Sequence, residues 1–177
     1  VSAVALGATY SRSGWLGIVF ALVVFLFLEN WRLIPLMAVL GVCALPLLPQ
    51  TILNRLLTIG NTRDSSLNYR FAIYQATEVL LKDYWAKGVG LGSDVLKSAF
   101  ETYPPMFDGN YPIHTHNNYL QVWGEMGIFG LVTFLGTIFY KLKQGAKAYL
   151  RNTDKRLRRF QAAAVAGFCG ILLISAA

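Results

Sequence analysis

The chain has 177 residues, of which 55% are hydrophobic and only 14% are charged, and its formal net charge is +7. This composition is too apolar for an ordinary soluble domain. The net charge comes mostly from one short basic stretch, residues 141–159, so it does not favour nucleic-acid binding.

Long apolar runs follow one another along the chain and predict an all-α integral membrane protein, a polytopic helical bundle. About 20 helical residues are needed to cross the hydrocarbon core of a bilayer. Residues 1–9 are apolar but too short to span alone, and we interpret them as the end of a preceding helix. Because the sequence has no initiator methionine and no signal peptide, we interpret it as an internal fragment of a longer protein. The expected spanning helices are residues 14–28, 33–49, 119–140 and 161–177.

The distribution of charge predicts a topology with three parts. Eight Lys or Arg residues and one acid lie between Lys141 and Arg159, which predicts a cytoplasmic connector. The segment 50–118 carries six basic and six acidic residues, a balance typical of the outer side. We therefore expect 1–49 to hold the end of a preceding helix and two transmembrane helices. We expect 50–118 to be a large outer loop and 119–177 to hold two transmembrane helices joined by the basic connector.

The outer loop contains predicted elements of its own. Residues 67–81 have apolar side chains at close to helical spacing, which predicts an amphipathic helix near the outer surface. The glycine-rich residues 88–92 predict a bend. Residues 95–103 predict a short helix that ends before Pro104 and Pro105.

Six side chains on the outer side are the candidates for chemistry. Both histidines lie in one tripeptide, His114-Thr115-His116, which is followed by Asn117 and by a predicted span that contains Glu125. Ionisable groups at membrane depth are costly, so each is a functional candidate. The predicted topology adds Arg12, in the other outer turn, and Arg70, on the outer helix.

Around these residues the sequence resembles the O-antigen ligase and Wzy-polymerase superfamily. His116-Asn117, nine further residues and then Gly127-Ile128-Phe129-Gly130 are similar to the family's His-Asn-x9-Gly-x-x-Gly signature. Ser11-Arg12-Ser13-Gly14 and Asn68-Tyr69-Arg70 resemble two further family elements, in the same order along the chain. The similarity covers about residues 9–135. Ala86 departs from the pattern, since the family often has a proline shortly before the glycine-rich bend.

The resemblance implies a metal-independent glycosyltransferase of the GT-C type, without a cofactor, in the bacterial inner membrane and with its active site facing the periplasm. Such enzymes pass a glycan from undecaprenyl diphosphate to a hydroxyl of lipid A-core, a polysaccharide or a protein. We expect His116 to accept the proton of that hydroxyl, because an imidazole with a pKa of about 6.5 can act as a base. We expect Arg12 and Arg70 to bind the diphosphate, since guanidinium groups match its charge and geometry. The further substrate-binding candidates are His114, Asn117 and Glu125.

Simpler interpretations stand beside these roles. His116 could be an interfacial histidine, and Asn117 and Asn118 could cap the next helix. The His-x-His pair could bind a metal, although no Cys or acidic cluster completes such a site. Glu125 could hydrogen-bond within the bundle to fix the histidine loop, or it could contact the acceptor sugar. The glycines of the signature are expected to permit close helix packing.

The alternative function is a non-catalytic transporter or flippase of lipid-linked glycan. Such a protein would also need a cationic outer cavity, but its spanning helices should carry distributed charges. Here the expected spans contain one acid, Glu125, and the polar candidates gather on one side. A structural scaffold would explain the hydrophobicity but not the two histidines beside a helix start. The pattern therefore favours an enzyme, and ligase and polymerase share the features found.

Overall fold

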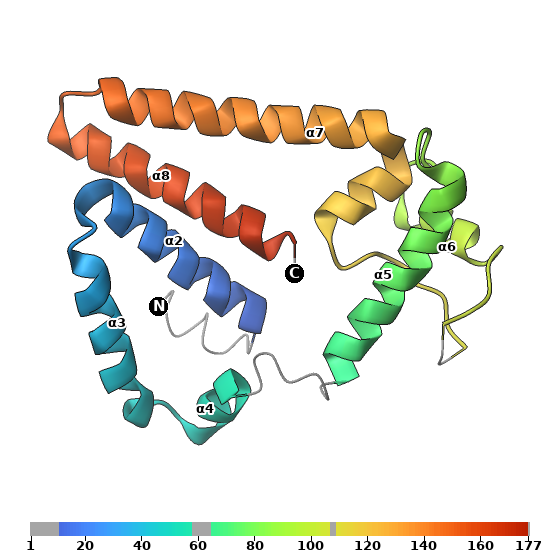
Figure 1. Ribbon diagram of the computed structural model, residues 1–177, viewed down its shortest axis with the longest axis horizontal. Helices are drawn as coiled ribbons and strands as arrows, with labels where there is room; N and C mark the ends of the chain where they lie inside the picture. The colour runs from blue at the N-terminus through green and yellow to red at the C-terminus, as the bar shows by residue number, and fades with distance from the viewer. Residues whose placement is uncertain (1–10, 58–64, 107–108, 177) are drawn as a thin grey trace. The chain divides into compact units, whose positions relative to one another are not determined.

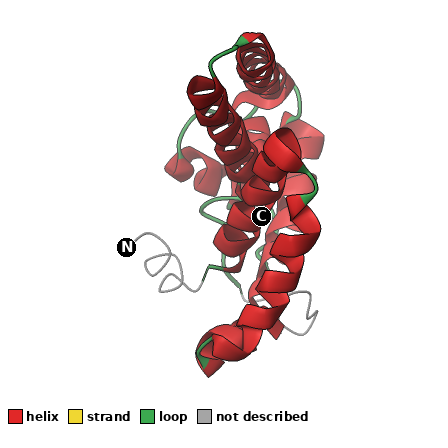
Figure 2. Ribbon diagram, turned by 90° about the vertical axis from the view of Figure 1, so that its left-hand side faces the viewer, coloured by secondary structure: helices red, strands yellow, loops and turns green. Residues whose placement is uncertain are grey.

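The computed structural model describes residues 11–57, 65–106 and 109–176, and these residues form helices and loops with no strand (Figure 2). The expectation of an all-α fold is confirmed. Two compact units divide the chain: α2, α3, α4 and residues 141–174 form the first, and α5, α6 and residues 118–140 belong to the second, together with 175–176. The helices are α2 (Arg12–Asn30), α3 (Leu33–Ala44), α4 (Gln50–Leu57), α5 (Ser65–Tyr84), α6 (Ser93–Phe100), α7 (Asn118–Arg151) and α8 (Lys155–Ile174), with the 3-10 turn η1 (Leu45–Leu47) after α3 (Figure 1).

Three helices of the described residues are long and apolar enough to cross a membrane, namely α2, α7 and α8. They correspond to three of the four predicted runs. The fourth run forms α3, which has 12 residues, and then η1, because Pro46 cannot continue the helical hydrogen bonding. At helical rises, α3 and η1 together extend about 24 Å, which is less than the roughly 30 Å hydrocarbon core. That this run spans the membrane stays a prediction.

In the first unit, α2 and α8 pack side by side through small residues (Figure 1). Gly17 is buried on α2, and Gly170 is buried on α8 one and two turns beyond Ala166 and Ala162. A Cβ atom added to Gly170 would lie 2.7 Å from the carbonyl oxygen of Gly17. The two backbones therefore approach at a distance that side chains would prevent, as is common where helices pack within membranes.

Polar contacts connect the C-terminal end of α2 with the end of α7 and the start of α8. The guanidinium of Arg159 lies 3.3 Å from the carboxylate of Glu29, and Arg158 donates to the hydroxyl of Tyr149 at 3.0 Å. That hydroxyl in turn donates to the carbonyl of Leu28. The end of α2 and the α7–α8 connector thus lie at the same end of the unit, and that this end is cytoplasmic stays a prediction.

The second unit has a small core between α5 and α6. Leu80, Leu96 and Phe100 are buried there against one another. The predicted helices 67–81 and 95–103 are confirmed as α5 and α6, although α6 ends at Phe100. Beyond that end, the hydroxyl of Tyr103 donates to the carboxylate of Asp83, which raises the pKa of Tyr103 to about 12. This contact ties the chain after α6 to the last turn of α5.

Candidate active site at the histidine loop

The helix that follows the histidines is interrupted. At Gly127 the backbone has φ 68° and ψ −170°, a conformation that is essentially restricted to glycine. α7 therefore consists of a short segment, residues 118–126, and a longer one from residue 128, and it changes direction between them (Figure 1). The prediction of one uninterrupted helix over residues 119–140 is wrong at this position.

The interruption lies against the glycine-rich bend that follows α5. Three backbone hydrogen bonds connect the two: Val89 N to Gly124 O at 2.9 Å, Gly90 N to Glu125 O at 2.9 Å, and Ile128 N to Trp85 O at 2.8 Å. The broken helix leaves backbone groups free of intrahelical partners, and the bend supplies partners for them.

Two glycines make this contact possible. A Cβ atom at Gly88 would lie 2.3 Å from the carbonyl oxygen of Glu125, and one at Gly127 would lie 2.2 Å from that of Ala86. Both residues also have positive φ angles, 71° and 68°. The first signature glycine therefore permits contact between two backbones at a helix break. The sequence predicted that the signature glycines permit close helix packing, and at Gly127 the close contact is with the bend that follows α5.

The loop before α7 is built around a buried threonine. Thr115 is fully buried, and its hydroxyl donates to the carbonyl of Asn117 at 2.7 Å. His116 has φ 53°, a left-handed conformation that few residues other than glycine adopt. This turn brings the His114 and His116 rings together, with their centroids 4.1 Å apart. The two exposed histidines thus stand as a pair on a loop that Thr115 anchors.

Asn117 caps the helix, as one interpretation of the sequence proposed. Its side-chain oxygen accepts hydrogen bonds from the backbone N–H groups of Tyr119, at 3.0 Å, and Leu120, at 3.1 Å. Its amide nitrogen donates to the carbonyl of Ala176 at 3.1 Å. Both ends of the Asn117 amide are therefore occupied by protein atoms, which favours a structural role over substrate contact.

Glu125 is connected to the histidine loop through Gln121. The Gln121 amide donates to the Glu125 carboxylate at 2.5 Å and accepts from the backbone N–H of Thr115 at 2.9 Å. Glu125 therefore has a hydrogen-bond partner within the protein, as the first of its two interpretations predicts. Sequence reasoning did not single out Thr115 or Gln121, although Gln121 and Glu125 are four residues apart, the spacing at which helical side chains meet.

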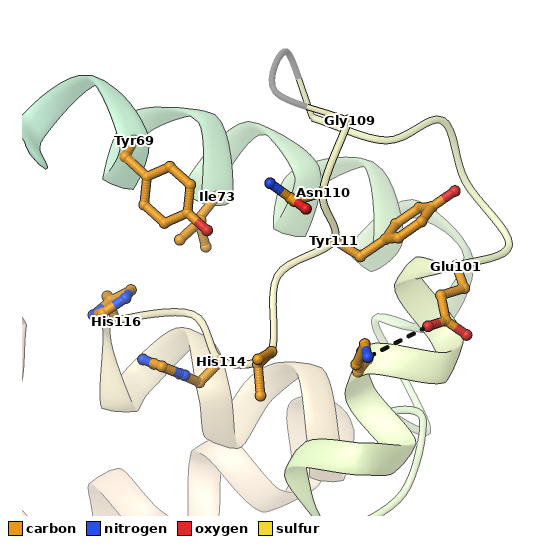
Figure 3. Close-up of a pocket in the computed structure, with 10 residues that line it drawn as sticks. Tyr69, Ile73, Glu101, Gly109, Asn110, Tyr111, His114 and His116 are labelled. Carbon is orange, nitrogen blue, oxygen red and sulfur yellow. Dashed lines mark ion pairs between the residues drawn. The ribbon is translucent and has the colours of Figure 1, made fainter. Parts of the chain in front are cut away.

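A cavity of about 360 Å³ opens beside the two histidines. Figure 3 shows Tyr69 and Ile73 of α5 on one side of it and His114 and His116 on the other. Glu101, which follows α6, lies farther along the cavity in Figure 3. It forms an ion pair at 3.8 Å with Lys97 of α6, which also lines the cavity. The remaining lining residues are Gly109, Asn110, Tyr111 and Ile113.

The surroundings of His116 favour its neutral form. Partial burial lowers the pKa of His116 below its usual 6.5, and the nearby charges of His114 and Arg70 lower it further. The imidazole is therefore mainly unprotonated at neutral pH, which is the form that can accept a proton. Arg70 is half-buried on α5, so the structure brings this predicted residue into the same electrostatic environment as His116.

Arg12 belongs to the first unit. It is the first residue of α2, next to Ser11, whose hydroxyl caps the helix by accepting from Gly14 N at 3.2 Å. Its joint action with Arg70 stays a prediction. As to metals, the described part of the chain contains no group of three or more His, Cys, Asp or Glu side chains that could hold an ion.

A second cavity, of about 690 Å³, lies between α5 and the short segment of α7. Sequence reasoning did not identify it. Trp123 donates its indole N–H to the carbonyl of Trp85 at 3.0 Å and so helps to hold the two helices together. The residues that line this second cavity are mainly aromatic and apolar: Tyr74, Glu78, Leu81, Lys82, Trp85, Asn117, Tyr119, Leu120 and Trp123.

Comparison with known proteins identifies the family. The family model described as O-antigen ligase matches residues 1–135, well over half of the chain. The chain belongs to the O-antigen ligase family. The matched region includes all six candidate residues and both glycine contacts, and the resemblance of the sequence is thereby confirmed. No curated protein and no solved structure matches the chain. Membership of this family implies glycan transfer of the ligase or polymerase type in a membrane environment.

Proposed function

We propose that this O-antigen ligase family member transfers a glycan from undecaprenyl diphosphate to an acceptor hydroxyl at the periplasmic face of the inner membrane. The observation that carries the proposal is the environment of His116. A neutral imidazole lines a cavity within the electrostatic reach of Arg70, and it belongs to the family's signature. A base with a cation within electrostatic reach is what transfer from a diphosphate leaving group needs.

The proposed reaction assigns each group a step. The acceptor oxygen attacks the anomeric carbon of the donor sugar while a ring nitrogen of His116 takes its proton. The bond between that carbon and the diphosphate oxygen breaks, and the diphosphate leaves with the bonding electrons. Arg70 and Arg12 balance the charge that develops on the diphosphate, and no metal is required. His114 adjoins the base and contacts the substrate in the cavity.

The test is a transfer assay with the purified protein, a donor of undecaprenyl diphosphate-linked glycan and lipid A-core as acceptor, with and without EDTA. His116→Asn is the informative variant, because asparagine tolerates the left-handed backbone of this position but cannot act as a base. We expect transfer to fall by about 10²–10⁴-fold while donor binding is retained. Transfer at the wild-type rate would remove His116 as the base.

The arginine assignment needs a separate comparison. Arg70→Ala should weaken donor binding, whereas Gln75→Ala, an exposed position on the same helix, should leave it unchanged. Transfer to lipid A-core would identify a ligase, and a ladder of products would identify a polymerase. Movement of the carrier across the membrane without a new glycosidic bond would overturn the enzyme in favour of a transporter.

A further inference from the structure

A chain of side-chain hydrogen bonds connects α7 to the backbone between the two histidines. The N–H of Thr115 donates to Oε1 of Gln121 at 2.9 Å, and Nε2 of Gln121 donates to Oε1 of Glu125 at 2.5 Å. Gln121 and Glu125 lie one turn apart on the short segment of α7. Thr115 is fully buried, so its N–H would lose an acceptor that water could not easily replace.

The order of donors and acceptors gives Glu125 a defined task. An ionised carboxylate only accepts hydrogen bonds, so it binds the NH₂ side of the Gln121 amide and not the carbonyl side. The carbonyl oxygen of that amide is then directed to the Thr115 N–H. Without the carboxylate, the Gln121 amide could exchange the positions of its oxygen and nitrogen. Its NH₂ group would then face the Thr115 N–H, which is also a donor. The ionised carboxylate therefore specifies the orientation in which Gln121 can hold the loop.

We propose that Gln121 and Glu125 are positioning residues for His116, with Glu125 orienting the amide of Gln121 and Gln121 holding the backbone between the histidines. The proposal rests on the proposed function insofar as His116 is the base. Of the two roles considered for Glu125, the proposal favours support of the histidine loop over contact with the acceptor sugar. Held in this way, the loop keeps the His116 ring beside that of His114 and at the cavity.

Exchanging the two side chains tests this arrangement. Gln121→Glu alone places two carboxylates in contact and should lower kcat by about tenfold or more, with the KM for the donor little changed. Glu125→Gln alone leaves the amide orientation unspecified and should cost about two- to threefold. In the double variant Gln121→Glu/Glu125→Gln, a carboxylate accepts from both Thr115 N–H and the new amide, so activity should return to within about threefold of wild type. Gln75→Glu, an exposed change of the same kind on α5, is the control for the added charge.

A second measurement does not depend on activity. In Gln121→Met the hydrogen bonds are lost without adding charge, and NMR titration of the histidine rings follows the loop directly. We expect the pKa of His116 to rise towards 6.5, because a released ring gains water and separates from His114. The titratable groups that line the cavity with His116 are unaltered in this variant: Tyr69, Lys97, Glu101, Tyr111 and His114, with Arg70 nearby.

The outcomes separate the two proposals. A double variant as impaired as Gln121→Glu, or a His116 pKa that is the same in Gln121→Met and wild type, would overturn the positioning role. A large loss in Glu125→Gln that the exchange does not repair would make Glu125 a substrate contact instead. If His116→Asn transfers normally, the base assignment fails, and the NMR titration still decides whether Gln121 holds the loop.

Discussion

Replacing Gly127 with alanine would force a side chain into the contact between α7 and the bend after α5. The φ and ψ angles of Gly127, 68° and −170°, would strain alanine by about 1–3 kcal/mol. The new Cβ atom would also lie 2.2 Å from the Ala86 carbonyl oxygen, so the bend must move away. The three backbone hydrogen bonds across this contact would then weaken, and each contributes about 1 kcal/mol. Gly127→Ala should therefore lower the free energy of unfolding by about 3–5 kcal/mol.

Gly136→Ala provides a matched control on the same helix. Nothing lies within 4 Å of a Cβ atom added there, and alanine improves helix propensity by up to about 1 kcal/mol. Thermal unfolding of the purified protein in detergent can be followed by tryptophan fluorescence, to which Trp85 and Trp123 at the contact contribute. Gly127→Ala should lower Tm by about 10 °C and Gly136→Ala should not lower it. A Gly127→Ala protein that unfolds within about 2 °C of wild type would refute the reasoning.

Three further outcomes are expected. The plot of kcat/KM against pH should rise through the pKa of His116, which lies below 6.5. His114→Ala should move that rise to higher pH, because a neighbour that lowers the pKa of His116 is removed. An unchanged profile would show that His114 does not lower the pKa of His116. Asn117→Ala should cost about 1 kcal/mol of unfolding free energy and Asn117→Asp much less, since only the latter keeps the capping oxygen, and equal losses in chemical unfolding would contradict the cap. Gly170→Leu should destabilise the α2–α8 packing in a thermal unfolding assay, whereas Gly167→Leu, with open space around it, should not; similar Tm values would argue against the close approach.

The helices were largely predictable where the signal lies within the residues of a single helix. Uncharged runs and helical spacing predicted α2, α8 and α5, because length and periodicity are local properties. The break at Gly127 was not predictable in the same way. Apolar residues continue on both sides of it, and the conformation of Gly127 is stabilised by a bend some forty residues earlier in the chain. A partner so distant in sequence leaves no periodic signal.

The site was predictable in its residue types but not in its connections. The signature predicted His116, and the topology predicted that Arg70 would lie on the same side. Thr115 appeared in the sequence only as the residue between two histidines. Its role depends on its burial and on the hydrogen bond from its N–H to Gln121, beside the left-handed turn at His116. Such a contact follows from backbone geometry that composition and spacing do not specify.

The spacing of the family signature has a physical explanation in this structure. The nine residues between Asn117 and Gly127 are the short segment of α7, with the cap at one end and the break at the other. Nine helical residues make about two and a half turns. Adding or removing one residue would rotate the histidine loop by about 100° relative to the bend that holds the break. The nine-residue spacing therefore sets the orientation of the histidine loop, with its Gln121 contact, relative to the bend that holds the break at Gly127.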